Sequence, residues 1–173
     1  VFDKGDAYKH YDAAKIFAEG KAKIEENNKT YLAKAEAEKA KKLAEFAANQ
    51  EKLVNEMKAG MQSTESGLYY KITKTTTGAN PTPGQTVAVH YAGKLINGEE
   101  FDNSFKRNAP IDIPIGVGQV IKGWDEGILL LKEGEAATLL IPPALGYGER
   151  GAGGVIPPNS WLVFDVELVK IAK

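Results

Sequence analysis

An abrupt change in composition at residues 63–67 places the strongest constraint on how this chain can fold. Residues 6–61 are dense in Ala, Lys and Glu and contain no proline. These residues favour helix, and their charges supply many pairs at i,i+4 spacing. Beyond residue 67, β-branched residues, glycine and proline dominate. We therefore expect an α-helical N-terminal extension over residues 1–62 and a second domain over residues 63–173.

Within the extension, the sequence predicts a first helix from Tyr8 to Glu26 and a second from about Thr30 to Lys58. The pair Asn27-Asn28 is the expected break between them, because Asn is a weak helix former. Apolar side chains recur at a/d-like positions of the second helix, with Gln50 between them: Leu43, Phe46, Leu53 and Met57. The alanine-rich start of that helix offers little surface to bury.

This uneven apolar stripe leaves three interpretations of the extension open. A solvated spacer helix agrees with the composition. A dimerising or client-holding arm agrees with the general need of an isolated helix for a packed face. A disordered linker is the third interpretation.

Composition and charge exclude several functional classes. The 173 residues suffice for one domain of ordinary size with an extension. A net charge of −1 without a basic, aromatic-bearing patch gives no case for nucleic-acid binding. No apolar run approaches the roughly 20 residues of a membrane span. The absence of cysteine excludes disulfides, cysteine catalysis and thiolate metal sites, but it does not distinguish a reducing from an oxidising compartment. Because the chain begins with Val1 and not with Met, we expect its start to have been processed or cut away, and a signal peptide or an earlier domain would not be visible in this sequence.

The second region shows the alternation typical of half-buried strands. Strands are predicted by this alternation at Leu68–Thr75, Thr86–Leu95, Glu135–Ile141 and Ser160–Ile171. A turn cluster separates the first two, and Asn97-Gly98 is a hairpin signal. Residues 122–132 read as a short helix that buries Trp124, Ile128 and Leu131. Several half-buried strands around one short helix indicate an α+β domain with an antiparallel sheet.

Conventional catalytic and cofactor sites are absent from the sequence. The two histidines, His10 and His90, lie in different regions and belong to no metal-binding or general-base motif, so no metal is expected. By strand alternation His90 points away from the Val89/Tyr91 face, which predicts a surface or hydrogen-bonding residue. The segment Gly116-Val117-Gly118 lacks the third glycine of a dinucleotide loop, and we expect no cofactor there.

Aromatic residues from five separate segments offer a different kind of site. They are Tyr91, Phe101, Trp124, Tyr147 and Phe164. A lone aromatic on a strand is usually core, but Tyr147 stands in a glycine-rich loop, where its hydroxyl can meet a ligand carbonyl. Such rings can line a concave apolar pocket. One acid, Asp102, follows Phe101 directly, and no nucleophile accompanies it. The combination suits a reaction that breaks no covalent bond.

The same segments resemble the FKBP-type peptidyl-prolyl cis-trans isomerases in order and spacing. The resemblance rests on Val89-His90-Tyr91, Phe101-Asp102-Asn103-Ser104, Val120-Ile121-Lys122-Gly123-Trp124, Gly146-Tyr147-Gly148, Ile156-Pro157-Pro158 and Leu162-Val163-Phe164-Asp165-Val166-Glu167-Leu168. It covers about residues 68–171. It implies a curved antiparallel β half-barrel wrapped on the helix that bears Trp124. It also implies accelerated rotation of X–Pro bonds in unfolded or proline-containing polypeptides.

The resemblance further implies which residues form the site. A proline pocket with Trp124 as its floor would comprise Tyr91, Phe101, Val120, Ile121, Trp124 and Phe164. Asp102, Tyr147 and Ile156 would line the rim, and Arg107 would pair with Asp102 or brace its loop. The Tyr147 hydroxyl and the Ile156 backbone N–H would then hold the carbonyls that flank the X–Pro bond. For Asp102 two roles stay open: an anchor for Tyr91 and the Arg107 loop, or a field acting on the twisted carbonyl.

Two positions at the pocket mouth depart from the family pattern. Ile111 stands where the family often has an aromatic wall, and Ala152 where the best-known eukaryotic members have histidine. We therefore expect weaker binding of the macrolides tacrolimus and rapamycin and a different preference for the residue before proline, without loss of activity.

Alternatives to an isomerase are a chaperone or binding module that captures prolyl segments with little turnover, and a structural protein whose helices matter most. The extension resembles, more loosely, the dimerising and client-holding N-terminal helices of bacterial FKBPs of the macrophage-infectivity-potentiator type. It also resembles the connector between cyclophilin and FKBP domains in fused isomerases. The first resemblance implies a homodimer through the helices. The resemblance to bacterial FKBPs implies a bacterial protein. Two locations stay open: the cytoplasm, and the periplasm or cell envelope.

Overall fold

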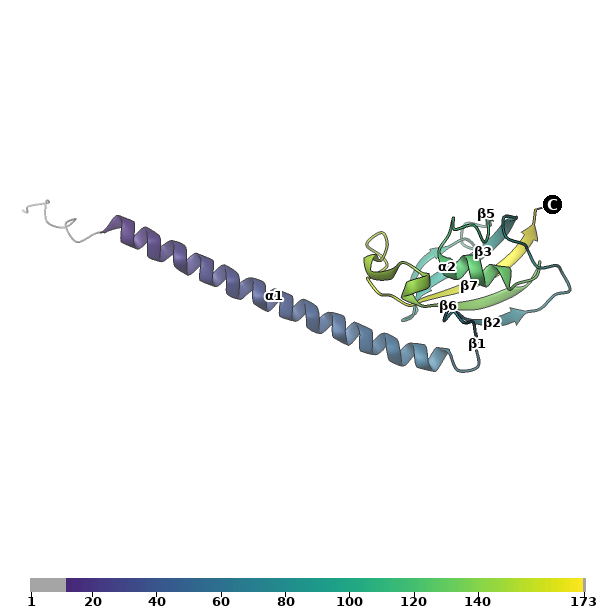
Figure 1. The fold of residues 1–173 in the computed structure, drawn as a ribbon, viewed down its shortest axis with the longest axis horizontal. Helices are drawn as coiled ribbons and strands as arrows, with labels where there is room; N and C mark the ends of the chain where they lie inside the picture. The colour runs from purple at the N-terminus through teal and green to yellow at the C-terminus, as the bar shows by residue number, and fades with distance from the viewer. Residues whose placement is uncertain (1–11, 173) are drawn as a thin grey trace, which may run out of the picture. The chain divides into compact units, whose positions relative to one another are not determined.

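The computed structural model describes residues 12–172 and divides into two compact units, Val1–Ala47 and Ala48–Lys173 (Figure 1). The predicted start of the first helix at Tyr8, and His10, lie outside the described residues. No helix among the described residues combines the length and the apolar character that a membrane crossing needs.

A single helix, α1 (Ala13–Met57), replaces the two predicted helices. The expected break at Asn27-Asn28 is therefore wrong. Asn costs well under 1 kcal/mol relative to the best helix formers, so two of them between Lys-, Glu- and Ala-rich turns do not end a helix. Thr30 Oγ1 donates to the Glu26 carbonyl at 2.9 Å, a bond made inside the helix across the expected break.

The second unit contains one curved antiparallel sheet. Its strands are β1 (Gln62–Ser63), β2 (Tyr69–Lys74), β3 (Thr86–Leu95), β4 (Glu100–Asn103), β5 (Ile111–Pro114), β6 (Ala136–Ile141) and β7 (Leu162–Ile171). The order in the sheet is β1-β2-β6-β7-β3-β4, and β5 also pairs with β3. The four predicted strands are confirmed. The short strands β4 and β5 were not predicted, because four residues are too few to show alternation.

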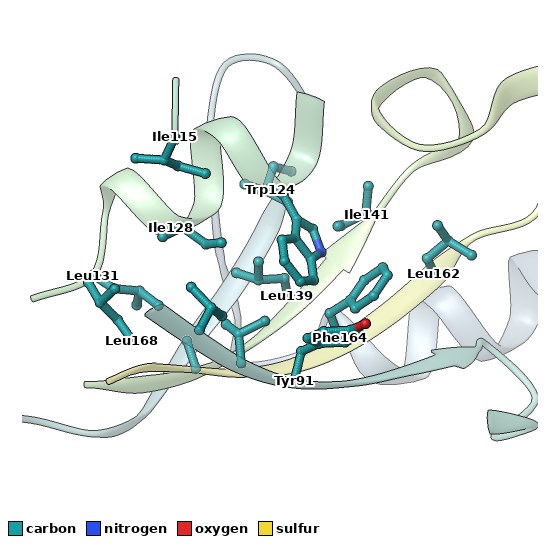
Figure 2. Packing of buried hydrophobic residues seen from close by; sticks show 14 of the residues in the cluster. Tyr91, Ile115, Trp124, Ile128, Leu131, Leu139, Ile141, Leu162, Phe164 and Leu168 are labelled. Carbon is teal, nitrogen blue, oxygen red and sulfur yellow. The ribbon is translucent and has the colours of Figure 1, made fainter. Parts of the chain in front are cut away.

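Helix α2 (Lys122–Leu129) packs against one face of this sheet, as predicted, although it ends three residues earlier than expected (Figure 1). Two glycines allow the close approach. A Cβ on Gly123 would lie 2.6 Å from Ile141, and one on Gly127 would lie 2.7 Å from Leu139. The core between helix and sheet includes the fully buried Ile128 and Leu139 (Figure 2). The close packing turns Trp124 of α2 towards the strands.

The other face of the sheet has a smaller core. Leu140 of β6 and Val163 of β7 pack there with Val54 and Ile96. Val54 belongs to the last turns of α1, which form part of the second compact unit. Leu140 is therefore buried although it alternates with the residues that face α2.

Candidate active site

A cavity of about 540 Å³ opens beside the concave face of the sheet, next to α2. Its lining residues come from four strands, from α2 and from two connecting segments: Tyr91, Phe101, Asp102, Ile111, Gln119, Val120, Ile121, Trp124, Tyr147, Ile156 and Phe164. All the predicted site residues except Arg107 lie in this lining, and Arg107 contacts Asp102 from outside it. Gln119 is not among the predicted site residues, because an exposed polar residue before Val120 carries no pattern that marks it.

Four rings form the inner part of the cavity in edge-to-face arrangement. The centroid of the Trp124 ring lies 5.0 Å from that of Tyr91, with an interplanar angle of 76°. It lies 5.2 Å from the centroid of the Phe164 ring, with an interplanar angle of 84° (Figure 2). The ring centroids of Phe101 and Phe164 are 5.6 Å apart, and the two ring planes make an angle of 81°. Such pairs contribute about 0.5–1.5 kcal/mol each beyond their buried area. The rings therefore hold one another in place and present a rigid apolar surface.

Gly93 of β3 makes this ring arrangement sterically feasible. A Cβ at this position would lie 2.7 Å from Phe101 Cε2 and 2.7 Å from Phe164 Cε1. Contacts below 3.0 Å do not occur in practice, so any side chain here would displace both rings. No sequence motif pointed to Gly93, because its importance depends on two residues brought to it by neighbouring strands.

The floor of the cavity carries an unpaired polar atom. Among the described residues, the Trp124 indole N–H is buried and has no hydrogen-bond acceptor. A buried donor left unpaired costs about 1–3 kcal/mol. The floor therefore behaves as an apolar surface with one donor available to a bound molecule.

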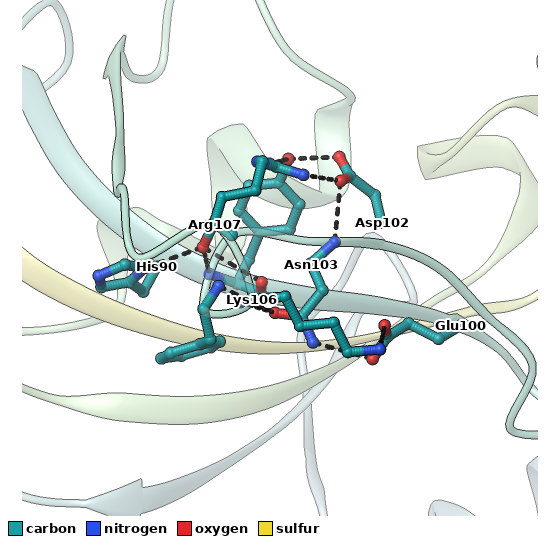
Figure 3. Close-up of polar contacts among 9 residues, drawn as sticks. His90, Glu100, Asp102, Asn103, Lys106 and Arg107 are labelled. Atoms are coloured by element: carbon teal, nitrogen blue, oxygen red, sulfur yellow. Dashed lines mark hydrogen bonds and ion pairs between the residues drawn. The ribbon is translucent and has the colours of Figure 1, made fainter.

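A polar cluster occupies one side of the rim. The Tyr91 hydroxyl and the Arg107 guanidinium both donate to the Asp102 carboxylate, and Arg107 Nη2 also donates to Tyr91 Oη at 3.0 Å (Figure 3). The Asn103 backbone N–H donates to Asp102 Oδ1 at 2.8 Å. Both carboxylate oxygens are thus engaged within the protein, as the anchor interpretation of Asp102 requires.

Burial and charge act in opposite directions on this cluster. Burial disfavours the ionised form of Asp102, but the hydrogen bonds from Tyr91, Arg107 and Asn103 outweigh it and hold the pKa of the carboxyl below its usual value. Burial, followed by the hydrogen bond to Asp102, raises the pKa of Tyr91. At neutral pH the cluster is therefore a carboxylate held by a neutral phenol and a guanidinium.

The loop after β4 is braced by His90 and Ser104. Ser104 Oγ accepts a hydrogen bond from the Tyr91 backbone N–H at 2.7 Å and lies 3.0 Å from His90 Nδ1 (Figure 3). The His90 ring stacks on Phe105 at 4.8 Å. The predicted hydrogen-bonding role of His90 is confirmed, and among the described residues no group of acids and histidines could hold a metal ion.

Tyr147 and Ile156 reach the rim from the connection between β6 and β7. Tyr147 directly precedes the short helix Gly148–Arg150, and its side chain is 38% exposed. Burial and the nearby negative charge of Asp102 raise the pKa of Tyr147, so its hydroxyl remains a proton donor at neutral pH.

The predicted role of the Ile156 backbone N–H is wrong. That N–H donates to the Ala152 carbonyl at 2.9 Å, and the Ala152 N–H donates back to the Ile156 carbonyl at 3.0 Å. The donor is therefore used inside the loop and is not available to a ligand. By contrast, the backbone N–H of Ile121, just before α2, has no acceptor among the described residues.

The Gly116-Val117-Gly118 segment does not form an open anion site. The backbone N–H groups of Gly116 and Gly118 donate to the two oxygens of the Asp125 carboxylate at 2.8 and 2.7 Å. A side chain of the protein thus occupies the position that a phosphate would need. The loop instead supports the approach to α2.

Comparisons with known proteins agree with this geometry. A family model described as FKBP-type peptidyl-prolyl cis-trans isomerase matches residues 77–169. FK506-binding protein 1 of Dictyostelium discoideum is 54% identical over 103 residues, which are 60% of this chain and 96% of that protein. A probable FKBP-type peptidyl-prolyl cis-trans isomerase of Haemophilus influenzae is 44% identical over 91% of this chain, which spans only 59% of that protein.

Among solved structures, the crystal structure of FkpA from Escherichia coli is similar with a TM-score of 0.69 and 38% sequence identity. The match covers 86% of this chain and 71% of that one. A match of this extent reaches beyond residues 63–173 into α1.

Proposed function

The chain belongs to the FKBP family of peptidyl-prolyl cis-trans isomerases, and we propose that its aromatic cavity accelerates X–Pro rotation in protein chains by binding the twisted amide without a covalent step. The observation that carries this proposal is the cavity itself. It combines four rings with hydrogen-bond donors at its edge, and no nucleophile lines it.

Accelerating this rotation requires only that the protein bind the twisted amide more tightly than the planar amide. Rotation about an amide is opposed by resonance, with a barrier of about 18–20 kcal/mol, although cis and trans X–Pro differ by only about 0.5–1 kcal/mol. Resonance puts partial charge on oxygen and nitrogen, and the twisted transition state loses much of it. An apolar cavity therefore binds the twisted amide better than the planar one. Each 1.4 kcal/mol of that preference gives about tenfold in rate.

In this proposal the rings of Tyr91, Phe101, Trp124 and Phe164 hold the pyrrolidine ring of proline. The Tyr147 hydroxyl and the Ile121 backbone N–H donate to carbonyls on either side of the bond, so the chain stays in place while the bond turns. Ile121 takes the role expected of Ile156 because its N–H has no acceptor among the described residues. The raised pKa of Tyr147 supports the donor role of its hydroxyl.

For Asp102 we propose the anchor role. Its oxygens accept hydrogen bonds from Tyr91, Arg107 and Asn103, which leaves little capacity for a substrate group. The carboxylate then acts through Tyr91, whose ring packs on Trp124. Arg107 completes the anchor from the neighbouring loop.

Separate Phe101→Ala and Asp102→Ala variants test the pocket. We expect each to lower kcat/KM for a short X–Pro peptide by about tenfold, which corresponds to about 1.4 kcal/mol. Phe101→Ala removes a ring that holds proline, and Asp102→Ala removes the anchor of the Tyr91 ring. The measurement is a protease-coupled isomerisation assay. Asp112→Ala is the matched control, because Asp112 is exposed on β5 and lies outside the cavity. Near-normal turnover in both pocket variants would refute the assignment. If the unmodified protein binds the peptide but does not accelerate its isomerisation, the binding-module alternative is favoured.

The residues at the cavity mouth bear on macrolide binding. Several relatives carry the name FK506-binding protein, and we propose that this chain binds tacrolimus and rapamycin with reduced affinity. Ile111 presents an aliphatic side chain to the cavity where a ring would give a larger contact. We expect Ile111→Phe to tighten binding in a calorimetric titration. Affinity of the unmodified protein equal to that of the eukaryotic members would contradict the proposal.

For residues 1–62 we propose an arm that pairs with a second copy of the chain. Large apolar side chains of α1 are exposed, including Phe17 at 77% and Leu32 at 60%. Such residues are stabilised by a packed partner surface. The connector interpretation predicts a monomer instead. Light-scattering mass in solution distinguishes the two.

A further inference from the structure

We propose that Gln50, on the last turns of α1, is a positioning residue for Tyr147 at the rim of the cavity. The proposal rests on the donor role given to Tyr147 above. It extends the functional machinery of the isomerase into a helix that contributes no residue to the cavity lining.

Gln50 is an unusual residue in α1. The charged and polar side chains of this helix are exposed, whereas Gln50 is only 5% exposed. It belongs to the compact unit that contains the sheet, one turn before the buried Val54. A buried amide of this kind needs partners for both its oxygen and its nitrogen.

Two backbone groups supply those partners. Gln50 Nε2 donates to the Asn159 carbonyl at 3.0 Å, and the Trp161 backbone N–H donates to Gln50 Oε1 at 2.8 Å. Asn159 lies in a turn and Trp161 directly precedes β7, so the amide of Gln50 bridges the backbone on the two sides of Ser160. The same pairing fixes which end of the amide is oxygen, because a reversed amide would oppose donor to donor.

The backbone of Asn159 connects this pairing to the loop of Tyr147. Asn159 has φ of 55°, a left-handed conformation that a non-glycine residue adopts at some energetic cost. Its carbonyl is held by Gln50, and its N–H donates to the Gly148 carbonyl at 2.8 Å. Gly148 directly follows Tyr147. One residue, through its own carbonyl and its own N–H, thus connects α1 to the residue that follows Tyr147.

Tyr147 depends on such support because little else holds its side chain. Tyr147 is 38% exposed, and among the described residues its hydroxyl has no hydrogen-bond partner. The position of the hydroxyl is therefore set mainly by the loop backbone. Small displacements of a positioned donor have large kinetic effects, since a misplacement of about 1 Å can cost up to roughly a hundredfold in rate.

A double-mutant cycle tests the link. The variants are Gln50→Leu, Tyr147→Phe and the combination of both, each assayed for kcat/KM with an X–Pro peptide. The matched control is Asn49→Leu, which replaces the preceding, exposed amide of the same helix. Thermal unfolding of each variant verifies that it is folded at the assay temperature, and Gln50→Glu, which retains the acceptor for Trp161, serves if Gln50→Leu does not fold.

We expect Tyr147→Phe to lower kcat/KM by about tenfold and Gln50→Leu by about threefold, in line with net hydrogen-bond strengths. Asn49→Leu leaves activity unchanged. In the Tyr147→Phe background, Gln50→Leu has no further effect, because the donor it positions is gone. An equal loss from Gln50→Leu in both backgrounds would show a general structural role and overturn the proposal, as would unchanged activity of Gln50→Leu. Normal activity of Tyr147→Phe would instead overturn the donor role on which the proposal rests.

Discussion

Gly93→Ala is expected to lower the isomerase activity by about tenfold to a hundredfold while the chain remains folded. The new Cβ would lie 2.7 Å from the rings of both Phe101 and Phe164, well inside contact distance. Relief by movement of β3 is unfavourable, because this strand pairs with β4, β5 and β7. The rings therefore move towards the cavity and fill the space that proline needs.

The magnitude follows from the size of the clash. Overpacking a tightly packed site costs about 1–3 kcal/mol. If the bound transition state bears most of that cost, kcat/KM falls by about tenfold to a hundredfold, at 1.4 kcal/mol for each factor of ten. The free energy of unfolding falls by a smaller amount, since in the empty cavity the rings have room to turn.

Comparison of kcat/KM with urea unfolding separates the two effects. Gly20→Ala is the matched control, because a Cβ at this position of α1 meets no other atom within 4 Å. We expect it to leave activity unchanged. A Gly93→Ala variant with normal activity would show that the two rings do not form the wall of the proline site.

How far the fold could be predicted depended on whether its determinants are local. Strand β3 has the predicted bounds, since ten residues of alternation define it. The predicted break at Asn27-Asn28 is wrong because the weak helix preference of Asn is a local effect too small to end a long helix. Strands β4 and β5 were not predicted, because pairing with β3 holds them and they are too short to show an alternation of apolar and polar residues.

The residues of the site were likewise predictable only where a local motif marks them. The ring residues could be named from motifs in the chain. Gly93 and Gln50 could not, since each acts through residues that only the folded sheet brings near. Gln50 appeared in the sequence as an interruption of an apolar stripe, yet its amide is paired with backbone more than 100 residues away. The engaged N–H of Ile156 was likewise invisible, because it depends on the hydrogen bonding of one loop.

Trp124→Ala is expected to have the largest effect on stability and to abolish measurable isomerase activity. Trp124 is 5% exposed and packs against Tyr91 and Phe164. Its removal leaves a cavity at the junction of core and site, and such truncations of a buried aromatic cost about 3–5 kcal/mol. Loss of activity in this variant alone would not distinguish loss of the Trp124 ring from the cavity floor from unfolding of the domain.

Trp124→Phe makes that separation. Among the described residues the indole N–H has no acceptor, so Phe loses no hydrogen bond and only part of the packing. We expect Trp124→Phe to cost about 1–2 kcal/mol in urea unfolding, below the value for full truncation. Activity falls by roughly threefold to tenfold, because a smaller ring leaves a looser floor beneath the proline. Equal losses of activity in the two variants would mean that the indole N–H, and not the ring surface, is what the bound prolyl chain requires.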